Sequence, residues 1–241
     1  MNIYQISDCG GRLENEDSIR VQQEKEYSLM ALADGLGGHG NGQLASQTAV
    51  ETVREMTQRL SAPQIDNPWF ENVFLTANQR VLDLKTSECS PKTTLVVLHI
   101  SIKSMTAQWA HLGDSRLYHF VDGRIAFCTF DHSVSRMAVL AREIAPEEIR
   151  FHPDRNKLLK VVGSEEAFLP EYDQCRLDDG LAHAFLLCSD GFWEYVTEEE
   201  MEIAYLYAAD VKEWVLSMQQ ILIEKAQGHN NDNYSAIAVV L

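Results

Sequence analysis

The sequence has no apolar run approaching the roughly 20 residues that a membrane-spanning helix needs, and its first residues contain no basic segment followed by an apolar stretch. We therefore expect neither a membrane span nor a secretory signal. The five cysteines are odd in number, scattered along the chain and include no C-x-x-C pair, which is typical of a reducing compartment. The sequence predicts a cytoplasmic protein.

Positive charge is also scarce, because 20 Lys and Arg residues stand against 36 Asp and Glu residues and give a formal net charge of −16. This excess of negative charge opposes binding to the phosphate backbone of DNA or RNA, so we expect no nucleic-acid partner. The hydrophobic fraction of 45% suits one buried core. We expect a monomer with a single domain over residues 1–241, whose last residues, 236–241, form a strand.

Two patterns of covalent catalysis are missing. No cysteine is followed six positions later by arginine, which excludes a phosphatase with a cysteine nucleophile. No G-x-S-x-G occurs, so the nucleophile turn of serine hydrolases is absent as well.

Short apolar runs rich in β-branched residues predict strands, and apolar residues at helical spacing predict helices in separate blocks. We expect helices beginning near Gly42, after Asn67-Pro68 and at Glu198, and a last one around Trp214. Helices in blocks favour an α+β fold with antiparallel sheets over a doubly wound parallel sheet. The strands are expected at 3–7, 27–33, 93–100, 106–112, 116–120, 185–188 and 235–240.

Acidic residues recur at the ends of these strands, each next to a glycine, an asparagine or another acid. Any one of them is adequately explained as a turn residue, but the whole set is harder to explain in that way. Oxygen ligands without a Cys/His cluster favour Mg²⁺ or Mn²⁺ over Zn²⁺. Two such ions about 3.5–4 Å apart can share and activate a water for in-line attack on phosphorus. The residues are Glu16, Asp17, Asp34, Asp114, Asp190 and Asp232.

Two further side chains are candidates for phosphate chemistry. Arg12 stands four residues before Glu16, and its planar guanidinium suits bidentate capture of a phosphate; alone, it would be read as a surface arginine paired with Glu14 or Glu16. His39, in a glycine-rich loop, has the residue type of a general acid, although a lone loop histidine is usually only solvated.

The same loop contains G-x-G-x-x-G at 35–40, between a predicted strand and a predicted helix, which is the fingerprint of dinucleotide binding. A dinucleotide fold would continue from the helix into a second parallel strand. Here a second helix follows, so we interpret the match as accidental.

Taken together, the motifs are recognisable: R-x-x-N-E-D at 12–17, A-D-G-x-G-G-H at 33–39, L-G-D-S-R at 112–116, D-H-S at 131–133, C-S-D-G at 188–191 and D-N-x-S at 232–235. In this order they resemble the bacterial branch of the metal-dependent protein phosphatase family, type 2C. The resemblance implies a four-layer α-β-β-α sandwich, with two central antiparallel sheets flanked by helices. It also implies hydrolysis of phosphoserine and phosphothreonine esters by metal-activated water at a two-metal centre.

The resemblance assigns the metal ligands by motif. Asp34, Asp190 and Asp232 would hold one ion. Glu16, Asp34 and the carbonyl of Gly35 would hold the second, so that Asp34 bridges the two.

The remaining roles follow from the same resemblance. Asp114, together with Asp190, would hold a third, weaker ion. Asp17 would orient a water bound to the metals, Arg12 would bind the substrate phosphate, and His39 would protonate the leaving serine or threonine oxygen.

Substrate choice would reside in a flap beside the active site, expected at about 133–179. The implied partners are phosphorylated proteins, in particular a bacterial serine/threonine kinase and its targets. Trp193 and Trp214 give the C-terminal helices an aromatic character that resembles phosphatases of type VI secretion, which is an analogy at the level of the fold. The family commonly has Glu where this chain has Gln43, a position that is not a metal ligand.

The alternative function is a catalytically inactive phosphatase fold kept as a binding module. Loss of a metal ligand is the usual mark of such a protein. Every matched ligand side chain is acidic in this sequence, and Arg12 and His39 are present, which favours the active enzyme.

Overall fold

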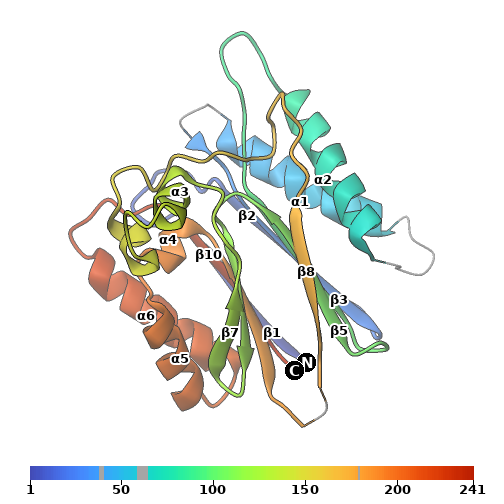
Figure 1. The fold of residues 1–241 in the computed structure, drawn as a ribbon, viewed down its shortest axis with the longest axis vertical. Helices are drawn as coiled ribbons and strands as arrows, with labels where there is room; N and C mark the ends of the chain where they lie inside the picture. Colours follow the sequence, from blue (N-terminus) through green and yellow to red (C-terminus); the bar gives the residue numbers. More distant parts are fainter. Residues whose placement is uncertain (38–40, 59–64, 179) are drawn as a thin grey trace.

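The computed structural model describes residues 1–37, 41–58, 65–178 and 180–241. Two five-stranded antiparallel sheets pack face to face, with pairs of helices on both outer sides (Figure 1). The first sheet has the order β1 (Asn2–Asp8), β10 (Tyr234–Val240), β9 (His183–Cys188), β6 (Arg116–Val121), β7 (Arg124–Cys128). The second has the order β2 (Asp17–Gln23), β3 (Tyr27–Asp34), β4 (Leu95–Ser101), β5 (Thr106–Leu112), β8 (Glu171–Arg176).

The helix pairs cover opposite sheets, as Figure 1 shows. On the second sheet lie α1 (Gly42–Gln58) and α2 (Asn67–Leu82), while α5 (Glu198–Tyr207) and α6 (Val211–Ala226) lie on the first. Local sequence sets their starts. The carboxylate of Asp66 accepts a hydrogen bond from Trp69 N–H at the start of α2, and Thr197 and Glu200 form a reciprocal capping box on α5.

Three apolar clusters hold these four layers together, one between the sheets and one under each helix pair. The alternation of β4 illustrates how one strand serves two of them. Val96 and Leu98 pack between the sheets, whereas Leu95 and Val97 face α1 and α2. The predicted α+β class and four-layer sandwich are confirmed.

All the predicted strands and helices occur, but three strands escaped prediction: β2, β7 and β8. Each lies at the edge of its sheet. Edge strands can keep one face polar, so β8, with the sequence EYDQCR, carries little apolar signal. Its pairing with β5 supplies the stabilisation that its own composition does not.

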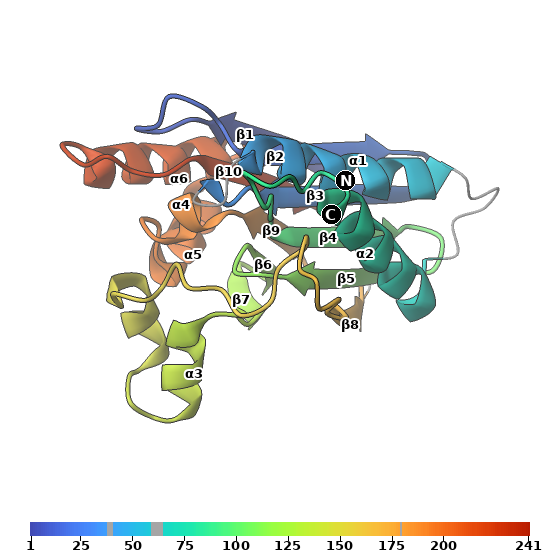
Figure 2. The same cartoon turned by 90° about the horizontal axis from the view of Figure 1, so that it is seen from above.

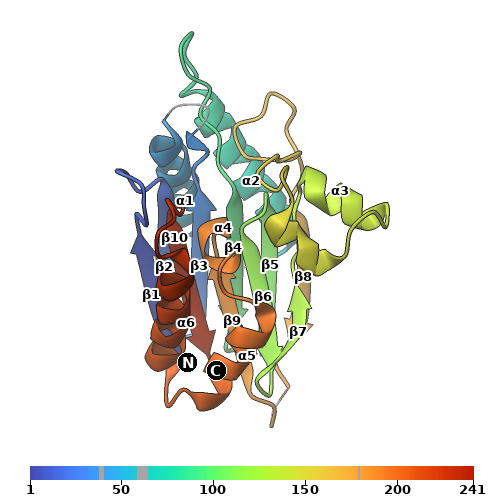
Figure 3. The ribbon, with the colours of Figure 1, turned by 90° about the vertical axis from the view of Figure 1, so that its left-hand side faces the viewer.

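The segment that joins β7 to β8 leaves the sheets and carries α3 (Val134–Leu140) and the 3₁₀ helix η2 (Pro146–Phe151), which project to one side in Figures 2 and 3. A bridge between Ser133 and Leu158 joins the two ends of the projecting part. The predicted flap region at 133–179 includes this projection and also β8 of the second sheet. Among the described residues, no helix has the length and apolar character to cross a membrane.

Candidate active site

A cleft of about 580 Å³ opens where several strands end. Asp34 is the last residue of β3, Asp114 lies between β5 and β6, and Asp190 begins the short helix α4 (Asp190–Trp193) directly after β9. Strands distant in sequence therefore deliver acids to one place. Of the predicted residues, the cleft is lined by Arg12, Glu16, Asp34, Gly35, Asp114, Asp190 and Asp232, together with Asn156 and Leu158 of the flap. His39 lies outside the described residues.

The carboxylates in this cleft are electrostatically frustrated. Burial, and then the charge of Asp190, raise the pKa values of Asp34 and Asp114 well above the ordinary range. Burial, with Glu194 and Asp232 nearby, raises the pKa of Asp190 to about 7. Carboxylates that repel one another in a desolvated cleft are stabilised by divalent cations, so this donor set of hard oxygens fits Mg²⁺ or Mn²⁺.

Asp17 lies beneath the cleft and is held by a serine. Its Oδ2 accepts a hydrogen bond from Ser189 Oγ at 2.7 Å, and that Oγ accepts one from Ser235 N–H at 2.9 Å. Its Oδ1 is buried and has no hydrogen-bond partner among the described residues. Burial raises the pKa of Asp17 to about 6. One oxygen is thus fixed and the other remains able to accept from a water, which suits the role predicted for this residue.

Two glycines, Gly37 and Gly42, lie against the carboxylate of Glu16. A Cβ on Gly37 would lie 2.1 Å from Glu16 Oε2, and one on Gly42 would lie 2.5 Å from Oε1, so no larger residue fits without displacing this acid. Burial raises the pKa of Glu16, although the backbone N–H groups of Gly42 and Gln43 act in the opposite direction. The side chain of Gln43 donates to Asn15 O at 3.2 Å. Close approach to neighbouring atoms thus accounts for Gly37, one glycine of the dinucleotide-like match, and for Gly42, which lies outside that match.

Arg12 reaches across the mouth of the cleft. Its Nη2 donates to Asp232 Oδ2 at 3.0 Å, and about half of its side chain is exposed. The ion pair of Arg12 in the structure is therefore with a predicted metal ligand near the other end of the sequence. An exposed guanidinium at this place can meet an incoming phosphate.

Asn233 is a positioning residue that the sequence analysis quoted within a motif but gave no role. Its Oδ1 accepts from Glu16 N–H at 2.8 Å, and its Nδ2 donates to the carbonyls of Cys9 and Glu14, both at 2.9 Å. The side chain is buried, so these three bonds tie the start of the chain to its end. Its place in D-N-x-S was the only available signal.

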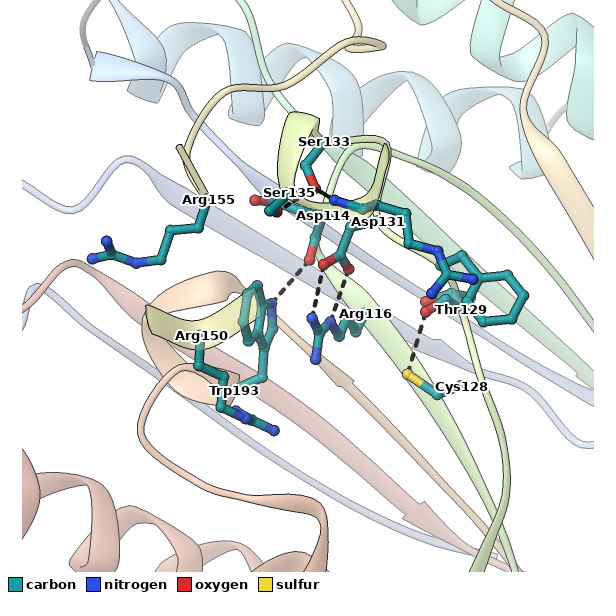
Figure 4. A network of polar contacts seen from close by, with 12 residues as sticks. Asp114, Arg116, Cys128, Thr129, Asp131, Ser133, Ser135, Arg150, Arg155 and Trp193 are labelled. Carbon is teal, nitrogen blue, oxygen red and sulfur yellow. Dashed lines mark hydrogen bonds and ion pairs between the residues drawn. The ribbon is translucent and has the colours of Figure 1, made fainter. Parts of the chain in front are cut away.

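A second set of supports surrounds the turn that carries Asp114 (Figure 4). Trp193 Nε1 donates to Asp114 O at 2.9 Å, and the guanidinium of Arg116 lies 3.6 Å from the centre of the Trp193 ring. Arg116 also donates to both oxygens of Asp131, at 2.8 and 2.7 Å. This buried bidentate pair fixes the turn from the side of the flap.

The comparisons with known proteins agree with this geometry. The family model described as protein phosphatase 2C matches residues 10–227. The chain belongs to the protein phosphatase 2C family. This membership confirms the predicted family and enzyme class.

Relatives of this protein phosphatase 2C chain include bacterial serine/threonine phosphatases. It is 32% identical to the serine/threonine phosphatase stp of Listeria welshimeri over 79% of this chain and 77% of that protein. The solved serine/threonine phosphatase Stp1 of Staphylococcus aureus has a TM-score of 0.89 and 25% identity, covering 99% of this chain and 94% of that one. The catalytic domain of the serine threonine protein phosphatase PstP in complex with two manganese ions has a TM-score of 0.81 and 25% identity, covering 100% and 98%.

Proposed function

We propose that this protein phosphatase 2C member hydrolyses phosphoserine and phosphothreonine esters of proteins at a centre of two Mg²⁺ or Mn²⁺ ions. The observation that carries the proposal is the convergence of buried acids with raised pKa values on a cleft that also receives Arg12. Relatives named serine/threonine phosphatases, one of them solved with two manganese ions, support it.

The proposed ligand assignment is the one that the family motifs imply, and the acids that line the cleft support it. Asp34, Asp190 and Asp232 would hold one ion, and Glu16, Asp34 and the Gly35 carbonyl the other, with a third, weaker ion at Asp114. The ions would activate a water and neutralise the phosphoryl oxygens.

The chain's own polar groups account for the remaining steps. Asp17, with one oxygen fixed by Ser189 and the other free to accept, would orient the attacking water. Arg12, half exposed beside Asp232, would bind two phosphoryl oxygens through its planar fork. His39 would give a proton to the departing serine or threonine oxygen, so that it leaves as a neutral alcohol and not as an alkoxide.

The open cleft and the projecting flap support a phosphoprotein substrate. A phosphorylated side chain would enter beside Asn156 and Leu158, and the polypeptide around it would contact the flap at about 133–179. We infer that the substrates are cytoplasmic phosphoproteins, including a bacterial serine/threonine kinase and its targets, and that the phosphatase acts as a monomer. A link to type VI secretion rests on the analogy drawn from Trp193 and Trp214.

The inactive binding module is the weaker alternative. A fold kept only for binding has no need to maintain buried acids that repel one another. In this chain Asp34, Asp114 and Asp190 are all retained at such a cost.

Metal dependence without thiol dependence tests the proposed function. A chelator should abolish phosphate release from a phosphothreonine peptide, and Mn²⁺ should restore it, because the cleft offers oxygen ligands and no nucleophilic side chain in a cysteine-arginine pattern. Iodoacetamide should leave the metal-loaded enzyme active, since its cysteines are all free but unused. Inactivation by iodoacetamide combined with resistance to chelator would refute this mechanism.

A further inference from the structure

His132 belongs to the D-H-S motif, to which the reaction described above gives no role. It is buried and forms two hydrogen bonds with Gly113. The ring Nδ1 of His132 accepts from Gly113 N–H at 3.1 Å, and the backbone N–H of His132 donates to Gly113 O at 2.9 Å. Gly113 immediately precedes Asp114 and has a φ of +105°, a conformation that favours glycine. His132 therefore fixes the backbone from which Asp114 projects into the cleft.

The backbone carbonyl of His132 also bonds to Leu159, where the projecting part of the flap returns to the sheets. His132 O accepts from Leu159 N–H at 2.7 Å, next to the bridge between Ser133 and Leu158. Leu158 lines the cleft. His132 thus links the turn that carries Asp114 to the part of the flap that returns beside the cleft.

The ring is held in turn by β8. His132 Nε2 lies 2.8 Å from Glu171 Oε1, and Lys160 Nζ lies 3.2 Å from the same oxygen. His111 stacks on the ring, with centroids 4.8 Å apart and planes 10° from parallel, and its Nε2 meets Phe130 O at 2.9 Å. Burial lowers the pKa of His132 to about 4, so the ring is neutral at neutral pH.

The tautomer of this neutral ring is decided by Gly113. Because Nδ1 accepts from a backbone N–H, the proton must be on Nε2, where it faces the Glu171 carboxylate. The ligand atoms of His111, His132 and Glu171 lie within 4.8 Å of one another, which is close enough to suggest a metal site. A cation on Nε2 would move the proton to Nδ1, against the Gly113 N–H. The geometry therefore favours a hydrogen-bonded support over a metal site.

We propose that His132, oriented by Glu171, is a positioning residue that aligns the Asp114 turn and the returning flap for attack on a phosphoprotein. The proposal deepens the proposed function of the same cleft and rests on it for its kinetic part. Its structural part concerns the hydrogen bonds of Gly113 and Leu159 and stands without turnover.

Two substitutions of His132 test the contacts of the two ring nitrogens one at a time. His132→Asn places an amide oxygen near the position of Nδ1, so it can still accept from Gly113 N–H. His132→Gln places an amide nitrogen near the position of Nε2, so it can still meet Glu171 but loses the acceptor for Gly113. Hydrogen exchange of the metal-free protein should therefore accelerate about 10-fold at Gly113 in His132→Gln, the worth of one hydrogen bond, and far less in His132→Asn.

Kinetics at saturating Mn²⁺ give the second readout. His132→Gln should lower kcat/KM on a phosphothreonine peptide by about 10- to 100-fold, as other supports of a metal centre do. Glu171→Leu, which removes the carboxylate 2.8 Å from Nε2, should lower it in the same direction even if a His132 variant folds poorly. Glu171→Gln, which keeps an acceptor oxygen, should restore most of the loss. Lys160→Met, which removes only the outer ammonium, is the matched control.

Unchanged exchange at Gly113 and unchanged kcat/KM in His132→Gln would overturn the proposal, as would a Glu171→Leu enzyme with normal kinetics. Stoichiometric Zn²⁺ binding that is lost in both His132→Gln and Glu171→Leu would overturn it in favour of a metal site. A wild-type protein without phosphatase activity would refute the proposed function instead, and the exchange comparison would still decide the positioning role.

Discussion

The Asp190→Asn variant is expected to lose at least about 100-fold in kcat on a phosphothreonine peptide at saturating Mn²⁺. A neutral amide is a weaker ligand for a hard cation than a carboxylate, and even residues that only support a metal ligand are typically worth 10–100-fold. Asp34→Asn should show a loss at least as large, because Asp34 would contact both ions. Asp173→Asn, on the exposed face of β8, is the matched control and should retain activity.

Above pH 7 the Asp190→Asn variant should not be destabilised in the metal-free state, which distinguishes a ligand from a structural residue. Burial raises the pKa of Asp190 from 3.8 to about 7. The folded protein therefore binds this proton more tightly than the unfolded chain. The resulting contribution to stability is complete below about pH 4 and is lost as the pH rises to 7. With chelator present, the Tm of Asp190→Asn relative to wild type should rise over that interval. Near-normal turnover, or a Tm that falls against wild type at pH 8, would contradict the ligand assignment.

Leaving-group dependence separates His39 from Arg12. An acid catalyst matters most when the leaving oxygen is strongly basic, and it is typically worth about 10²–10⁴-fold. His39→Gln should therefore depress kcat far more on phosphopeptides than on p-nitrophenyl phosphate, whose nitrophenolate needs little protonation. Arg12→Ala removes a contact to phosphoryl oxygens that both substrates share, so kcat/KM should fall for each. Equal losses of His39→Gln on the two substrates would remove the case for a general acid.

The fold was predictable where the chemistry of a segment is set by its own burial. β4, with the sequence LVVLHIS, is mostly apolar because both of its faces are covered, and α1 and α2 show one apolar stripe each. β2 and β8 were not predictable, since an edge strand can be polar and still gain its hydrogen bonds from a neighbour. Their position depends on which strand they pair with, and local sequence does not record it.

The site was predictable to the extent that its residues lie at strand ends. Acids such as Asp34 and Asp190 can be recognised in the sequence by the apolar run before them and the glycine after them. The residues that hold these acids in place could not be recognised in this way. Asn233 bonds to the backbone of Glu16 across 217 positions, and Trp193 bonds to the carbonyl of Asp114 across 79. Contacts of this range are created by the packing of the two sheets, so no local spacing predicts them.

The most direct test of the account is to count the Mn²⁺ ions that the protein binds at equilibrium and to measure phosphate release on the same samples. The acid-lined cleft predicts that turnover of a phosphothreonine peptide rises as two ions bind per chain, and that Asp34→Asn fails to bind both and fails to turn over. Full hydrolysis by wild-type protein with no ion bound would contradict the central claim.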